Sequence, residues 1–200
     1  MKFQSTLAAA LLAMSATGSA FADAIPYPGG GENATTYTFT ASHDGDITAY
    51  FMGTGASYVE TLGLLVNGTS TGITGLNNHD PAVGVGSSLD LGAVHAGDVL
   101  TFYINVLTTG DKWYSDVSRN SDKSNHVYST AYTGGVAGVP VGTYVGFEDL
   151  PASGSDFNYF DETFVFTNVS TTPSVPEPGN VALLLAGLGL MGVVARRRGV

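Results

Sequence analysis

The chain of 200 residues contains no cysteine. This absence excludes disulfide bonds, thiolate zinc sites and cysteine nucleophiles. A folded domain of this composition must therefore take its stability from an apolar core, from bound metal, or from both.

Basic residues are scarce between the two ends of the chain. Residues 23–174 carry 16 of the 17 acidic residues but only three of the seven basic ones, a difference of 13 negative charges. Such a surface repels nucleic acid and anionic lipid and favours cations. We therefore expect no nucleic-acid partner.

Catalytic motifs are missing as well. The sequence has no Gly-x-Ser-x-Gly elbow, no phosphate-binding glycine loop with a lysine, and no His-Glu-x-x-His zinc motif. His126 stands apart from the other histidines, so we interpret it as a structural hydrogen-bonding residue. The adjacent carboxylates Glu148-Asp149 and Asp161-Glu162 are candidates for glycoside hydrolysis, but neighbours on one strand point to opposite faces. We therefore expect no enzyme. A secreted hydrolase is the least favoured of the functional alternatives.

The first 22 residues have the pattern of a secretory signal peptide. Lys2 supplies a positive charge, Leu7–Ala16 form an apolar segment, and Ala20 and Ala22 provide a small-x-small cleavage site. Cleavage by signal peptidase would leave Asp23 as the new N-terminus. The alternative is an uncleaved membrane anchor, for which the apolar segment is short.

The C-terminal segment joins a proline-rich hinge, an apolar run and a basic cluster. The apolar run Val181–Ala195 carries no charge. As a helix it reaches about 22 Å, short of the roughly 30 Å hydrocarbon core of a bilayer. With Gly179 and Asn180 drawn in, we predict a transmembrane helix over residues 179–195. The terminal arginines place the C-terminus in the cytoplasm. The alternative is a buried C-terminal helix of a soluble domain.

These three parts resemble the PEP-CTERM sorting signal of Gram-negative bacteria, the substrate tail of exosortases. The residues that carry the resemblance are Val175, Pro176, Glu177, Pro178, Arg196, Arg197 and Arg198. The resemblance implies that a membrane-embedded exosortase recognises the tail and cuts near the Pro-Glu-Pro. It also implies a precursor anchored transiently in the inner membrane and a mature protein at the cell surface or outside the cell.

The middle of the chain alternates apolar and polar residues with period two, which is typical of strands packed on one face. His43–Asp46 offer turn chemistry between the first two strands, which predicts a hairpin. We predict a single all-β domain over residues 23–169, a β-sandwich of jelly-roll type, followed by a Ser/Thr/Pro spacer over residues 170–174. The predicted strands are Tyr37–Ala41, Ile47–Phe51, Tyr58–Val66, Leu89–Val94, Asp98–Leu107, Val127–Tyr132, Thr143–Phe147 and Thr163–Val169.

Two polar stretches, residues 108–126 and 148–162, are rich in oxygen-bearing side chains. Calcium needs six to eight oxygen ligands, which acidic loops at sheet ends can supply. The spacing of Asp156, Asn158 and Asp161 fits such a loop, although acidic loop residues also occur simply as solvated surface.

The amino-acid sequence of these stretches resembles DUF4114, a domain that recurs in bacterial surface proteins and accompanies PEP-CTERM tails. The resemblance lies in Gly146–Pro151, in Ser155–Asp161 with the strand after it, and in Asn120–His126. Asn125, Asn158 and Phe160 depart from the family pattern, which would weaken calcium binding. The candidate calcium ligands are Glu148, Asp149, Asp156, Asn158 and Asp161, with Asp122 as an outlying contributor.

Trp113 and Tyr114 form an aromatic pair in the long polar stretch. Exposed, they would make a platform for sugar rings such as those of exopolysaccharide; folded back, Trp113 would cover the core. We therefore expect a structural or adhesive surface protein of an extracellular matrix, biofilm or floc. The alternative is a calcium-dependent carbohydrate-binding module.

Overall fold

The computed structural model describes residues 25–27 and 31–173. The predicted signal peptide with Ala20 and Ala22, the sorting motif and the predicted membrane helix over residues 179–195 lie outside these ranges. Among the described residues there is no helix of the length and apolarity that a membrane crossing requires.

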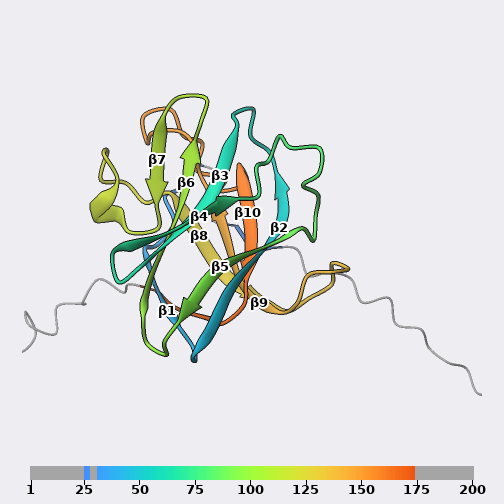
Figure 1. The fold of residues 1–200 in the computed structure, drawn as a ribbon. Coiled ribbons are helices and arrows are strands. Elements are labelled where there is room, and N and C mark those ends of the chain that lie inside the picture. Colours follow the sequence, from blue (N-terminus) through green and yellow to red (C-terminus); the bar gives the residue numbers. More distant parts are fainter. Residues whose placement is uncertain (1–24, 28–30, 174–200) are drawn as a thin grey trace, which may run out of the picture.

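The described residues form an all-β fold of two antiparallel sheets (Figure 1). The first sheet has the order β11-β1-β6-β3-β4, with β7 also paired to β6, and the second has the order β5-β2-β10-β9-β8. This confirms the all-β prediction, and the jelly-roll type stays a prediction. The elements are β1 (Tyr37–Ala41), β2 (Gly45–Thr54), β3 (Glu60–Val66), β4 (Thr69–Gly75), β5 (Ser88–Val94), β6 (Val99–Val106), β7 (Asp111–Tyr114), the short 3-10 helix η1 (Val117–Arg119), β8 (Val127–Tyr132), β9 (Gly142–Phe147), β10 (Glu162–Phe166) and β11 (Val169–Pro173).

The core lies between the two sheets and follows the period-two pattern of the strands. Alternate residues of β6, from Leu100 to Val106, point into it and are buried. Phe102 of β6 stacks on Phe166 of β10 with ring centroids 4.0 Å apart, so side chains of opposite sheets meet directly. Full burial of each such side chain contributes about 1.5 to 3 kcal/mol.

The predicted hairpin between the first two strands is wrong. β1 pairs with β11 and β6, whereas β2 pairs with β10 and β5 in the other sheet. The chain therefore crosses from one sheet to the other at the turn. Asn168 holds this turn, because its side chain accepts a hydrogen bond from the His43 amide and donates one to the His43 carbonyl.

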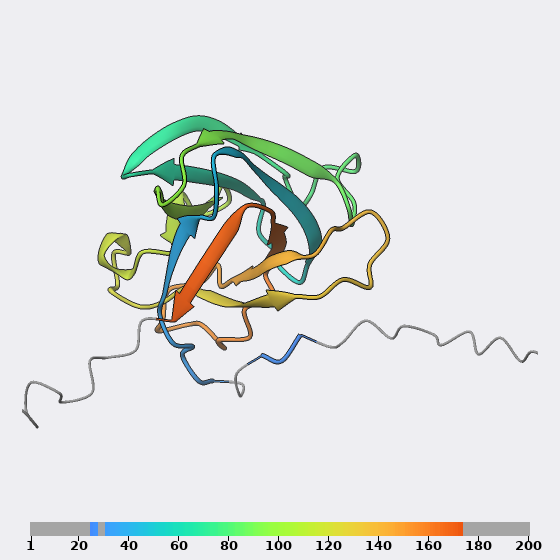
Figure 2. The same ribbon diagram turned by 90° about the horizontal axis from the view of Figure 1, so that it is seen from below.

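Residues 170–174 were predicted as a spacer, but Val169–Pro173 form β11. All five residues pair with β1, and Figure 2 shows β11 in orange-red beside β1 in blue. Ser170 and Thr172 are exposed and Thr171 is half-buried, as suits an edge strand that packs few side chains into the core. The domain therefore extends to Pro173.

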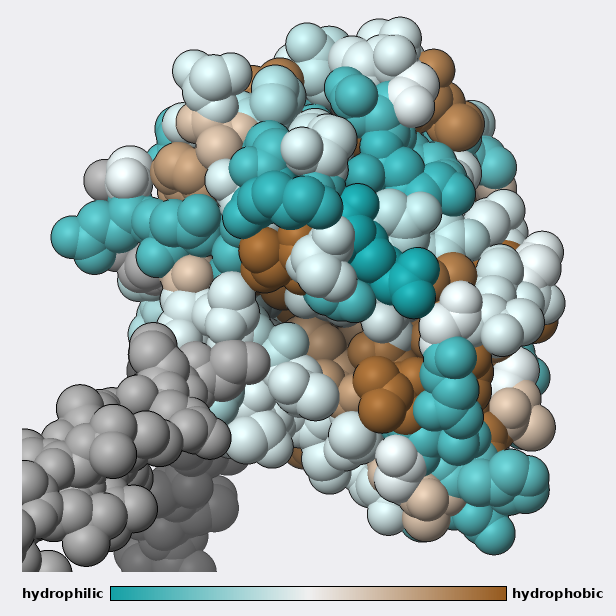
Figure 3. All heavy atoms as spheres, turned by 90° about the vertical axis from the view of Figure 1, so that its left-hand side faces the viewer, coloured by the Kyte–Doolittle hydropathy of each residue, from teal (hydrophilic) through white to brown (hydrophobic). Residues whose placement is uncertain are grey.

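The stretch 108–126 was predicted as a loop, but it contains β7 and η1. β7 pairs with the end of β6, which turns Trp113 inward. Figure 3 views the side of the molecule that carries β7 and η1, and shows a largely hydrophilic surface with hydrophobic residues in separate patches.

A second apolar cluster lies on the outer face of the second sheet. Tyr128, Tyr144 and Val165 point away from the main core and meet Tyr159 from the loop before β10. The N-terminal lead-in covers them, since Ile25 and other lead-in residues pack against this cluster. The loop that precedes β10 is thereby fixed on both sides.

Candidate functional site

Five acidic residues come together where three strands begin or end. Glu148 and Asp149 directly follow β9, Asp161 directly precedes β10, and Glu162 opens β10. Phe147 pairs with Glu162 in the β9–β10 ladder, so these positions are neighbours. Glu60 opens β3 in the opposite sheet, close enough that the charges of Asp149, Asp161 and Glu162 act on it.

Three of these carboxylates have the spacing of a metal site. One oxygen from each of Glu148, Asp149 and Asp161 lies within 4.8 Å of the other two. Two oxygens that bind one calcium ion at about 2.4 Å can be at most about 4.8 Å apart. The expectation that Glu148 and Asp149 diverge is wrong, because both residues lie beyond the end of β9.

The cluster contains carboxylate oxygens that are buried without a partner. Glu60 and Glu162 are each 0% exposed and Glu148 is 1% exposed. Both oxygens of Glu60, both of Glu162 and one of Glu148 have no hydrogen-bond partner. Unpaired buried charges are strongly unfavourable, so carboxylates in such a position call for a bound cation or for protons.

The pKa values of these acids reflect that cost. Burial, followed by the contact with Asp149 and the charges around it, raises the pKa of Glu60 to about 11. Burial and the charge of Asp161 raise the pKa of Glu148 to about 7. Burial also raises the pKa of Asp161 to about 6 and that of Glu162 well above its ordinary value. A divalent cation would reverse these shifts, since it stabilises the charged form.

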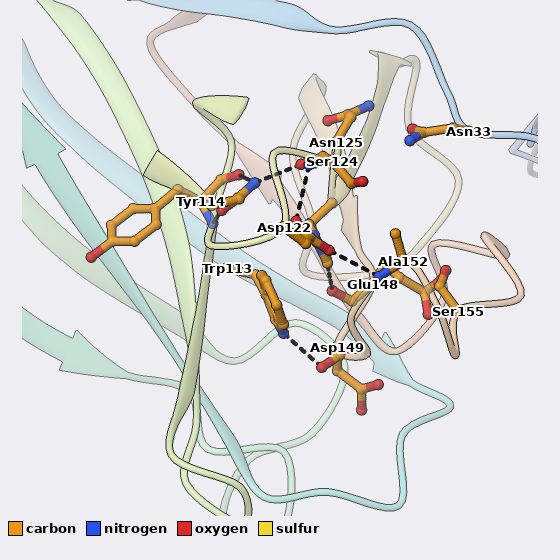
Figure 4. A network of polar contacts seen from close by, with 12 residues as sticks. Asn33, Trp113, Tyr114, Asp122, Ser124, Asn125, Glu148, Asp149, Ala152 and Ser155 are labelled. Atoms are coloured by element: carbon orange, nitrogen blue, oxygen red, sulfur yellow. Dashed lines mark hydrogen bonds and ion pairs between the residues drawn. The ribbon is translucent and has the colours of Figure 1, made fainter. Parts of the chain in front are cut away.

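Trp113 and His126 brace the segment that carries Glu148 and Asp149. Figure 4 shows the Trp113 side chain pointing toward Asp149. The Trp113 Nε1–H donates to the Asp149 carbonyl at 2.7 Å, and His126 Nδ1 lies 3.0 Å from the Glu148 carbonyl. The two rings stack with centroids 3.9 Å apart. These contacts fix the backbone on which the carboxylates stand.

Asp122 completes this support from the opposite side of the histidine. Its carboxylate lies 3.1 Å from His126 Nε2 and accepts the Ala152 amide hydrogen at 2.9 Å. The two His126 nitrogens therefore face different oxygens, Nδ1 the Glu148 carbonyl and Nε2 the Asp122 carboxylate. Partial burial raises the pKa of Asp122, but the Ala152, Ser124 and His126 hydrogen bonds outweigh it, so the net pKa is below the ordinary value.

The structure places the six predicted ligands in three settings. It brings Glu148, Asp149 and Asp161 together, but it places Asp122 in the supporting ion pair with His126. His126 is a buried hydrogen-bonding residue, as predicted.

Asp156 and Asn158 serve the turn before β10. The Asp156 side chain accepts the Asn158 amide hydrogen, and the Asn158 side chain accepts that of Phe160. These bonds support Phe157 and Tyr159, whose φ angles of 51° and 53° are unusual for residues other than glycine. Both polar residues are exposed, outside the group of three.

The aromatic pair does not form an exposed platform. Trp113 is 2% exposed and covers the core, which is the second of the two expectations for it. Tyr114 is half-buried, and its ring packs beside Tyr103. This burial contradicts the prediction that Trp113 and Tyr114 form a stacking surface for sugars.

Glu60 and Glu162 were not among the predicted ligands. The alternation of core and outward-facing residues along their two strands could have identified them as buried. Glu60 has the same parity as Leu62 and Leu64, and Glu162 the same parity as Phe164 and Phe166, all of which are core residues. An acid in register with core residues is a better indicator of a buried site than the spacing of acids in a loop.

Comparison with known proteins gives one finding, and it concerns the C-terminal segment. No curated protein and no solved structure matches the chain. The resemblance to DUF4114 stays a prediction. The PEP-CTERM protein-sorting motif matches residues 174–198, so the chain carries a signal that marks an exported protein, anchored in the membrane as a precursor and processed by exosortase.

Proposed function

We propose that this is an exported, exosortase-processed surface or matrix protein whose domain binds calcium through Glu148, Asp149 and Asp161. In this proposal it is a structural or adhesive component of a biofilm or floc rich in exopolysaccharide. The sorting motif at residues 174–198 supports export and processing. In this proposal, bound calcium stabilises the fold of a domain that works outside the cell without disulfide bonds.

The observation that carries the calcium proposal is the unpartnered, buried oxygen of Glu148 within a group of three carboxylates. All donors in the group are oxygen, which suits calcium or magnesium and not zinc. Calcium accommodates irregular sets of six to eight ligands, whereas magnesium demands a near-octahedral set and keeps several waters. A buried, irregular group of carboxylates therefore favours calcium.

The structural role is favoured over carbohydrate recognition. The alternative of a calcium-dependent carbohydrate-binding module needed an exposed aromatic platform, and Trp113 is buried. Association with exopolysaccharide remains part of the proposal, through the acidic surface and calcium rather than through ring stacking.

A calcium titration of the domain tests this proposal. A fragment spanning residues 23–173 contains every strand and both apolar clusters of the described chain, so it carries its complete core. Addition of calcium at about ten times Kd should stabilise it by about 1.4 kcal/mol and raise the melting temperature by about 3 to 6 °C. The fluorescence of Trp113, the single tryptophan, should change with it.

The controls separate the site from general ionic effects. The double variant Glu148→Gln, Asp161→Asn should lose the calcium response. Asp46→Asn removes an exposed acid from the other end of β2 and should keep it. Absence of any shift at about millimolar calcium, the range of weak extracellular sites, would overturn the proposal.

A further inference from the structure

Strands β1 and β6 separate at Tyr37. The Phe39–Leu100 pair closes their ladder at this end. One more hydrogen-bonded pair would set Tyr37 opposite Phe102, but Ser115 takes that place. The Ser115 Oγ accepts the Phe102 amide hydrogen at 3.0 Å, and the Ser115 amide donates to the Phe102 carbonyl at 2.8 Å. The two strands therefore diverge around Ser115.

This divergence leaves the backbone of Tyr37 facing a gap. Successive residues of an antiparallel strand direct their N–H and C=O groups alternately to the neighbour on either side. The Ala41 amide donates to the Asp98 carbonyl on the β6 side, so Phe39 and Tyr37 face that side as well. Phe39 meets Leu100 there, whereas Tyr37 lies beyond the end of the ladder. One N–H and one C=O therefore point into the gap.

An open cleft of about 330 Å³ occupies this gap. Residues 36–39, 99–101 and 115–117 line it. Val99, which is 48% exposed, and Val117 give it apolar surface. Its volume is at the lower end of the range for small-molecule sites, about 300 to 1,000 Å³, so it suits a ligand of the size of one sugar ring. The polar side chains of the lining belong to Thr36, Tyr37, Thr38, Thr101, Ser115 and Asp116.

The backbone groups that face the cleft belong to one residue, which disfavours a peptide strand as the ligand. Thr35, the preceding residue of the same parity, has its carbonyl engaged by Asn125 Nδ2 at 3.1 Å. Phe39, the following one, is paired with Leu100. An added strand needs hydrogen bonds at several such residues in succession. A sugar needs one, because each hydroxyl both donates and accepts, so two neighbouring hydroxyls can accept from the Tyr37 N–H and donate to its C=O.

We propose that this cleft binds a neutral sugar residue of a polysaccharide, with two neighbouring ring hydroxyls on the Tyr37 backbone and further hydroxyls on Thr38 and Thr101. The inference rests on the association with exopolysaccharide in the proposed function, because it names the class of sugar that the domain contacts. The C–H groups of the ring would lie on Val99 and Val117. This contact uses hydrogen bonds and needs no exposed aromatic ring.

The charge of the cleft selects a neutral sugar. The Asp116 carboxylate lines the cleft and can accept hydrogen bonds from sugar hydroxyls. The same carboxylate repels the negative charge of an acidic sugar, and the excess of acidic residues over the whole domain acts in the same direction. A neutral ring therefore fits the cleft better than a uronic acid.

An NMR titration of the isotope-labelled fragment of residues 23–173 locates the site without any substitution. The probes are methyl glucoside, methyl galactoside and methyl mannoside, and a chelator is present so that binding is measured apart from the calcium response. At least one probe should shift the amide signals of Tyr37, Thr101 and Val117 in a saturable way. We expect a Kd on the order of 1 mM, which suits a ligand of about a dozen heavy atoms. Glucuronic acid should bind more weakly.

Two substitutions test the hydroxyl groups of the cleft. Thr38→Val and Thr101→Val each remove one hydroxyl and keep the branched shape of the side chain. Each should raise the Kd of the sugar by about threefold to tenfold, the scale of one hydrogen bond. Thr172→Val is the matched control, because Thr172 lies opposite Thr38 in β11 and is not part of the cleft lining. It should leave the Kd unchanged.

Each other result has a definite meaning. No saturable shift of the Tyr37 amide with any of the three sugars overturns the inference, and so does a shift produced by an alanine tetrapeptide but by none of the sugars. A Kd that stays the same in both Thr38→Val and Thr101→Val also overturns it. These results leave the calcium site untouched, since the melting temperature tests that site separately. A domain that binds the sugars but shows no calcium response refutes the calcium proposal and leaves the cleft assignment standing.

Discussion

Gly146 on β9 allows the loop before β10 to cross the sheet closely. A Cβ atom at this position would lie 2.2 Å from the carbonyl oxygen of Tyr159, and a backbone atom cannot move aside cheaply. We expect Gly146→Ala to lower the free energy of unfolding by about 2 to 3 kcal/mol, measured by urea denaturation. Gly84→Ala, where a Cβ meets nothing within 4 Å, should change it by less than about 0.5 kcal/mol. Equal effects of the two substitutions would contradict the role of Gly146.

Asp122 is expected to act on stability and not on metal stoichiometry. Asp122→Asn removes the charge that faces His126, whose side chain is fully buried. Since the Asp122 carboxylate is only 20% exposed and accepts hydrogen bonds from the Ala152 and Ser124 amides, its loss should cost about 2 kcal/mol, the scale of hydrogen bonds to a charged group. Native mass spectrometry should still count the same calcium ions.

The matched control for Asp122 is the surface pair Asp116–Arg119. These side chains are about as exposed as each other, at 41% and 40%, and approach to 3.3 Å. An exposed pair of this kind contributes at most about 1 kcal/mol, so Asp116→Asn should have a smaller effect than Asp122→Asn. A loss of calcium ions in Asp122→Asn would show that Asp122 is a ligand after all.

The candidate site was only partly predictable because one residue type has several uses. Asp156 and Asn158 have short polar side chains, which support turns as readily as they bind metal, and their spacing alone does not distinguish the two roles. Glu148, Asp149 and Asp161 were found because they flank strands. Their partner in the opposite sheet, Glu60, is distant in sequence, so only the fold brings it to them.

The stability of the calcium-free domain should depend on pH because of Glu148, which follows β9, and Asp161, which precedes β10. Burial and neighbouring charge raise the pKa of Glu148 to about 7 and that of Asp161 to about 6 in the folded state. Between about pH 4 and pH 7 the folded state therefore binds more protons than the unfolded state, and stability falls as pH rises. Glu60 and Glu162, with raised pKa values, act in the same direction.

Urea denaturation with a calcium chelator, compared at about pH 5 and about pH 7.5, measures this dependence. The free energy of unfolding should be higher at the lower pH. The double variant Glu148→Gln, Asp161→Asn should show a smaller difference, because its two main titrating groups are gone. A chelated domain that gains stability from pH 5 to pH 7.5 would count against the folded-state pKa values.

Strand positions were predictable where core residues alternate, and strand partners were not. β8 was predicted with its observed bounds, and β3 and β6 to within two residues, because apolar side chains mark one face. β4 and β7 were missed, since threonine, glycine and charged residues dominate them. The partners of β1 were mispredicted because the turn after it is compatible with both a hairpin and a crossing between sheets.

For the whole molecule, we expect the mature protein to lack both ends of the chain. The sorting motif at residues 174–198 marks the C-terminal segment for exosortase, and residues 1–22 have the pattern of a signal peptide. Intact mass measurement of protein recovered from the cell surface or medium should give a chain that starts at Asp23 and ends near Pro176–Pro178. A strain without exosortase should keep the C-terminal segment. Recovery of the full chain from Met1 to Val200 in the cytosol would contradict this expectation.

The pairing of β11 with β1 has a mechanical consequence for an attached protein. Pro173, the last residue of β11, lies opposite Tyr37, the first residue of β1, at the end of a ladder of five residue pairs. Tension applied through Pro173 across the strands would peel this ladder one pair at a time. Because Val169 is the one hydrophobic residue of β11 that packs against the main core, the edge strand would give way while the two sheets stay closed. Strand β11 would therefore detach reversibly: it would extend under force and pair with β1 again when the force is removed.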